Sequence, residues 1–77
     1  MNKDSIETQR ADIIRYLETH PEGITLFEAF INLGISKLST RVGEIIRDGW
    51  MQIEKIPEIR KYPNGKTKRF MRYRKAA

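Results

Sequence analysis

The sequence predicts a small α+β domain in which three helices are followed by a two-stranded β-hairpin. Apolar residues recur at helical spacing as far as Gly49, and two stretches rich in strand-forming residues then flank Asn64-Gly65. The chain has 77 residues, of which 39% are hydrophobic and 32% charged. That length and composition suit one globular domain over residues 1–77, with a thin core.

The first helix is expected over residues 5–19. Ser5 can cap its N-terminus, and apolar side chains recur on one face. The sequence His20-Pro21-Glu22-Gly23 then ends the helix, because a residue before proline avoids helical angles. Ile24 is expected to form a short stretch of strand. The apolar face of this helix comprises Ile6, Ile13, Ile14 and Leu17.

The second helix is expected over residues 26–33. Thr25 and Glu28 have the spacing of a capping box, and Gly34 supplies a left-handed stop. So short a helix is marginal on its own, so its apolar residues must dock on the rest of the domain. We therefore expect the core to include Phe27, Phe30 and Ile31.

The third helix is expected over residues 37–48. Ser36 can cap it, Gly49 ends it, and an apolar stripe follows the i, i+4, i+7, i+8 pattern. Only Gly34-Ile35-Ser36 separates it from the second helix, which is the spacing of a helix-turn-helix. The stripe, expected to be buried, comprises Leu38, Val42, Ile45 and Ile46.

The hairpin, or wing, is expected over residues 50–74. Asn64-Gly65 favours a type I′ turn, in which both central residues have positive φ. Pro57 cannot donate to a sheet, so it predicts either a bulge or the edge where the hairpin leaves the body of the domain. Trp50 and Phe70 are expected to pack in the core.

Charge is distributed unevenly along the chain. Basic and acidic residues number three and six in residues 1–36, three and three in 37–54, and nine and one in 55–77. A basic segment of this density favours a polyanionic partner. The alternative is a solvated or partly disordered C-terminal tail.

Residues 12–73 resemble the small winged helix-turn-helix domains found in bacterial phages and prophages. The resemblance lies in residues 24–29, 34–38 and 41–50, and its most specific part is the Arg-x-x-x-x-x-Arg-Asp-Gly run that starts at Arg41. It implies a DNA-binding regulator, an excision-type factor or a module of a larger phage protein. Gly43 departs from the pattern, since such helices usually carry a helix-forming polar residue there. It is either tolerated or allows a partner to approach closely.

Helical geometry indicates which residues would contact DNA. The side of the third helix opposite its apolar stripe would face the major groove, with Lys37, Thr40 and Glu44 near base edges. Glu44 would accept from a cytosine amino group, and Arg41 would more readily pair with Glu28 or Glu44 than read a base. The alternative for Thr40 and Glu44 is simple exposure to water. The candidate residues are Ser36, Lys37, Thr40, Arg41, Glu44 and Arg47 in the helix, and Arg60, Lys61, Tyr62, Lys66, Lys68, Arg69, Arg72 and Arg74 in the wing.

Other functions are disfavoured. The chain has no cysteine and one histidine, His20, so neither a catalytic triad nor a metal-ligand cluster can be assembled. We expect no enzymatic activity and no cofactor. No segment approaches the roughly 20 apolar residues of a membrane span. Met1–Glu7 does not look like a signal peptide, because it lacks an apolar stretch. We therefore expect a cytoplasmic protein, in the cytoplasm or nucleoid of a bacterial host. The expected partner is double-stranded DNA, bound by a monomer, a homodimer or a side-by-side assembly. The alternative function is that of a winged-helix module that binds a host or phage protein.

Overall fold

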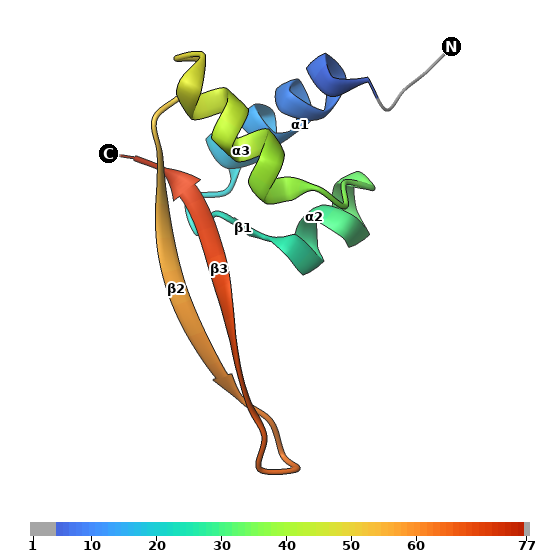
Figure 1. The fold of residues 1–77 in the computed structure, drawn as a ribbon, viewed down its shortest axis with the longest axis vertical. Coiled ribbons are helices and arrows are strands. Elements are labelled where there is room, and N and C mark those ends of the chain that lie inside the picture. Colours follow the sequence, from blue (N-terminus) through green and yellow to red (C-terminus); the bar gives the residue numbers. More distant parts are fainter. Residues whose placement is uncertain (1–4, 77) are drawn as a thin grey trace.

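The computed structural model describes residues 5–76. The elements follow the order expected, and the β-hairpin extends well beyond the helical body (Figure 1). The expected fold class is confirmed; residues 1–4 and 77 of the domain expected over 1–77 lie outside the described residues. The elements are α1 (Ile6–Thr19), β1 (Ile24–Thr25), α2 (Leu26–Leu33), α3 (Leu38–Arg47), β2 (Ile53–Lys61) and β3 (Thr67–Lys75).

Local capping signals determine where the first two helices begin. The Ser5 hydroxyl accepts from the backbone N–H of Thr8 at 3.1 Å. Thr25 and Glu28 form the predicted capping box, and Gly34 ends α2 at φ 68°. The predicted cap at Ser36 is wrong: α3 begins at Leu38, so Lys37 occupies the cap position and makes no side-chain cap hydrogen bond.

The sheet has three strands in the order β1-β3-β2. The predicted strand at Ile24 is confirmed, since Ile24 pairs with Tyr73 of β3 and so attaches the hairpin to the helical body. β2 and β3 pair in one unbroken register from Ile53 opposite Lys75 to Lys61 opposite Thr67. Residues 55–75 are therefore not a disordered tail. The bulge predicted as one option at Pro57 is absent. Pro57 lies opposite Met71, one residue beyond the last pair of β1 and β3, so the other option, the edge where the hairpin leaves the body, is correct. Its missing N–H is tolerated because β2 is an edge strand.

The turn at the wing tip differs from the predicted type I′ turn. In the described residues only glycines have positive φ, so Asn64 does not, whereas Gly65 has φ 85°. The backbone N–H of Gly65 donates to the Tyr62 carbonyl at 2.9 Å, and the Asn64 side chain accepts from the N–H of Lys66 at 3.0 Å. A two-residue hairpin would need an N–H from residue 63, which proline lacks. Pro63 instead suits the second position of a longer turn.

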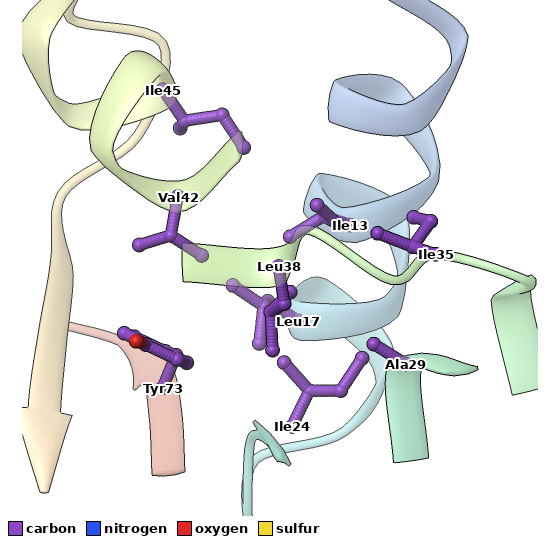
Figure 2. Packing of buried hydrophobic residues seen from close by; sticks show 9 residues of the cluster. All are labelled: Ile13, Leu17, Ile24, Ala29, Ile35, Leu38, Val42, Ile45 and Tyr73. Atoms are coloured by element: carbon purple, nitrogen blue, oxygen red, sulfur yellow. The ribbon is translucent and has the colours of Figure 1, made fainter. Parts of the chain in front are cut away.

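The core lies where the three helices meet the base of the sheet (Figure 2). Three of the four residues predicted from the stripe on α3 are fully buried, and Ile46 is 39% exposed. Tyr73 enters the core from β3 and joins the hairpin to the helices. The buried residues are Ile13, Leu17, Ile24, Ala29, Ile35, Leu38, Val42, Ile45 and Tyr73.

The prediction that the aromatic residues form the core is wrong for α2. Phe27 is 73% exposed and Phe30 59%, while Ala29 and Leu33 on the other side of α2 pack inward. The α2 helix is apolar on nearly every side, so its sequence does not indicate which side docks. Of the residues predicted to lie in the core, those that are exposed instead are Phe27, Phe30, Ile31, Ile46 and Trp50. Phe70 is only half-buried and lies under Arg60 on the hairpin.

Candidate nucleic-acid interface

The face of α3 that points away from the core is exposed and polar. At 100° per residue, Thr40, Gly43 and Arg47 lie opposite the buried stripe of the helix, and all three are exposed. Ser39 is also exposed and was not predicted; it lies on the flank of this face, where helical spacing gives only a weak signal. We call this set the outward face of α3, and it comprises Lys37, Ser39, Thr40, Gly43 and Arg47. The predicted site residue Ser36 is exposed in the turn before α3, where it lines a groove with residues of α2.

Arg41 and Glu44 belong instead to an ion-pair network between α1 and α3. Arg41 donates from Nη1 to both carboxylate oxygens of Glu44 at 2.7 and 2.8 Å, and from Nε to Gln9 at 3.0 Å. Arg10 of α1 donates to Glu44 at 3.1 Å and to Asp48 at 2.8 Å. The predicted pairing of Arg41 with Glu44 is confirmed.

The predicted position of Glu44 is wrong. Its side chain is only 19% exposed and points to the flank that packs on α1, not to the outward face. Arg41 is likewise only 12% exposed. Arg10 also lies over the Trp50 ring, with 5.1 Å between Cζ and the ring centroid. These residues therefore fix α3 against α1, and both Arg41 and Glu44 are already occupied by partners within the chain.

The network keeps its carboxylates ionised. The hydrogen bond from Arg41, assisted by Arg10 and opposed by burial, lowers the pKa of Glu44 below its ordinary value. The pKa of Asp48 is lowered chiefly by its hydrogen bond to Arg47. A carboxylate whose pKa is lowered on folding stabilises the fold above its unfolded pKa, and that contribution is lost as the pH falls through the folded pKa.

Replacing Glu44 with Gln is therefore expected to destabilise the protein at pH 7 and to have less effect in acid. Glu44 is half protonated at about pH 4.5 in the unfolded chain and only at a lower pH in the folded one, because its folded pKa is lowered. The urea midpoints of wild type and Glu44→Gln should accordingly converge from pH 7 to pH 3. Glu18→Gln, which changes an exposed glutamate on α1, is the control. A constant difference across this range would contradict the network's electrostatic role.

The base of the wing is held by ion pairs. Arg72 donates to Glu58 at 2.7 Å and to Glu28 of α2 at 3.3 Å, and its side chain is only 17% exposed. The hydrogen bond from Arg72 lowers the pKa of Glu58. Arg74 pairs with Glu54 at 2.5 Å. The structure therefore places two predicted wing contacts, Arg72 and Arg74, in ion pairs within the chain and not on an open basic surface.

Of the seven other basic residues in the hairpin, two, Lys55 and Lys75, are exposed near its base, and five lie at its far end. We define the distal wing as residues 59–69, which contain no acidic residue. The distal wing contains five basic residues, and all five are exposed. Within the part of the chain that the structure describes, none of them forms an ion pair. They are Arg60, Lys61, Lys66, Lys68 and Arg69.

Strand alternation places these cations on both faces of the hairpin. Arg60 is opposite Lys68 in the register, and its guanidinium lies over the Phe70 ring at 5.7 Å. Arg69 lies on the other face, opposite Ile59. At the tip, Tyr62 and Asn64 line a concave surface with Lys66 and Lys68. Phosphates on either side of the hairpin would thus meet positive charge.

Two further features bear on the function. Over residues 5–76, no helix is long and apolar enough to cross a membrane. Over the same residues, no group of three or more histidine or acidic side chains is placed to hold a metal ion.

Two short helices joined by a tight turn (α2 and α3), an exposed polar face on α3 and a basic β-hairpin that follows define a winged helix-turn-helix, a class of domain that suggests DNA binding. A family model described as a winged helix-turn-helix domain matches residues 8–74, and the chain belongs to that family. The expectation of a winged helix-turn-helix domain is thereby confirmed. Comparisons with curated proteins and with solved structures found no match.

Proposed function

We propose that this protein is a sequence-specific double-stranded DNA-binding protein, acting as a phage or bacterial transcriptional regulator or excision-type factor, with no catalytic activity of its own. The observation that carries the proposal is the combination of an exposed polar face on α3 with a distal wing whose five cations form no ion pair within the described residues. One copy, or two side by side, would occupy the site.

In this arrangement α3 enters the major groove by its outward face. Thr40 and Ser39 are short polar side chains that can reach base edges, and Lys37 at the start of the helix can contact a phosphate or a guanine. Arg47 pairs with Asp48 at 3.0 Å but its side chain is 68% exposed, so it would exchange that partner for the backbone phosphate at the other end of the helix. The distal wing lies on the backbone or in the minor groove.

One observation favours a second function, a module that binds another protein. The side of α2 that faces away from the core carries large apolar residues, among them Phe27 and Phe30, and DNA phosphates offer such residues no partner. The charge of the distal wing favours DNA.

Salt titration of the wild-type protein on one duplex tests the proposal. If the distal wing and one end of α3 neutralise about six phosphates, log K should fall against log salt with a slope near −5, because each contact releases roughly 0.9 counterion. Selection from random duplexes at two salt concentrations then measures sequence preference. A flat salt dependence would contradict DNA binding and favour the protein-binding module.

Replacing Gly43 with Ala is expected to stabilise the fold and weaken DNA binding. Gly43 lacks a positive φ, and a Cβ built there meets nothing within 4 Å, so nothing inside the protein requires glycine. Alanine should add about 1 kcal/mol of helix stability and raise the melting temperature by roughly 4–8 °C. The added methyl on the outward face should reduce duplex affinity several-fold. Melting and duplex titration of the same sample measure both effects; a stabilised variant with unchanged affinity would place Gly43 outside the interface.

A further inference from the structure

The exposed side of α2 forms a continuous apolar surface, which we name the α2 surface. Its four residues occupy neighbouring positions on the helix, and each is more than half exposed. On the opposite side, α2 packs into the core through Ala29 and Leu33. A surface helix normally carries polar residues on the side facing water. The four residues, with their exposed fractions, are Leu26 (53%), Phe27 (73%), Phe30 (59%) and Ile31 (61%).

The size of the α2 surface indicates a binding site. An aromatic side chain contributes roughly 150–250 Å²; taking a similar value for each of the four residues, their exposures leave roughly 400–600 Å² of apolar surface. Only the largest patches on monomeric proteins reach this size, and they often have a function. In a domain of 77 residues, whose described part has nine buried core residues, few large apolar side chains can be left exposed without loss of core burial.

We propose that the α2 surface binds the same surface on a second copy of this chain, as a symmetric dimer. The surface is complementary to itself, because it contains both a projection and a hollow. Leu26, Phe27, Phe30 and Ser36 line a shallow groove of about 410 Å³, and Phe27 is the most exposed of the four apolar residues. In a two-fold pairing, Phe27 of each copy enters the groove of the other.

Charge favours an antiparallel pairing of the two α2 helices. Glu28, Glu58 and Arg72 cluster at the N-terminal end of α2 and carry a net charge of −1. Beyond the C-terminal end lies Lys37, which is exposed and adjacent to the groove residue Ser36. Antiparallel packing brings the acidic end of each helix toward the basic end of the other. The two helix dipoles then point in opposite directions, which is the favourable arrangement. The basic distal wing takes no part in the contact.

The expected dimer is weak. Pairing two such surfaces buries roughly 800–1,200 Å² in total, which is typical of transient association, so a dissociation constant of roughly 10–100 µM is expected. Sedimentation equilibrium of the full chain without DNA, from micromolar to millimolar concentration, measures it. Phe27→Gln should raise the dissociation constant at least tenfold. Ile59→Gln, at an equally exposed apolar residue on the wing (68%), should leave it unchanged.

A second measurement requires no variant. In amide NMR spectra of the wild type, the concentration-dependent shifts should lie in α2 and around Ser36, and not in the distal wing. A chain that stays monomeric to millimolar concentration overturns the proposal, as does a dimer that Phe27→Gln leaves intact. Because no DNA is present, these results do not depend on the proposed function: a monomer that binds duplex DNA refutes the dimer alone.

Discussion

Replacing Ile45 with Ala is expected to lower the free energy of unfolding by about 2–5 kcal/mol. Ile45 is fully buried on α3, between that helix and the rest of the core (Figure 2). Alanine removes three buried carbons and leaves a cavity that a close-packed interior fills only in part. At about 0.05–0.15 kcal/mol per residue, the whole domain has roughly 4–12 kcal/mol of stability, so one substitution would remove a large share of it.

The neighbouring residue supplies a matched control. Ile46 has the same side chain on the same helix but is 39% exposed, so Ile46→Ala should cost clearly less than Ile45→Ala. Urea unfolding measures both, and Ile45→Val, expected to cost about 0.5–1.5 kcal/mol, gives a value if Ile45→Ala does not fold. Equal losses at the two positions, or an Ile45→Ala variant that melts within a degree or two of wild type, would contradict the observed orientation of α3.

The fold could be predicted where the signal is local. The capping box at Thr25 and the stop at Gly34 depend on residues close together in sequence, and both were predicted correctly. For the same reason three of the four residues of the predicted stripe on α3 are buried, although Ile46 is not. The orientation of α2 was not, because a helix that is apolar on nearly every side has no amphipathic pattern to read. The type of turn at Asn64-Gly65 was predicted wrongly, because Pro63, one residue earlier, excludes the two-residue hairpin loop that this dipeptide favours.

The candidate site could be predicted only in part, because its details depend on distant partners. The wing's excess of basic residues is visible in the composition, but which of them remain available is not. Arg72 pairs with Glu28, which is 44 residues away in sequence, and Glu44 pairs with Arg10, which is 34 residues away. Helical spacing alone placed Glu44 beside Thr40 on the outward face, whereas the position of α1 makes that flank an interior contact.

The distal wing is expected to provide most of the affinity for duplex DNA. Replacing Lys66 and Lys68 with Ala should weaken binding to every duplex by roughly 10–100-fold near 0.1 M salt. The slope of log K against log salt should become shallower by up to about two units, because two phosphate contacts and the counterions they release are lost. Stability should hardly change, since both side chains are exposed and exposed charges contribute little to it.

The control variant makes the same change in net charge at the other end of the hairpin. Lys55 and Lys75 are exposed near the base of the wing, and Figure 1 shows how far the tip lies from the helical body. If the distal wing touches the backbone directly, replacing Lys55 and Lys75 with Ala should alter affinity and slope much less than the change at the tip. Equal effects from the two double variants would mean that only the overall charge of the protein attracts DNA. The distal wing would then have no direct contact with phosphate, and sequence recognition by α3 would have to position the protein without it.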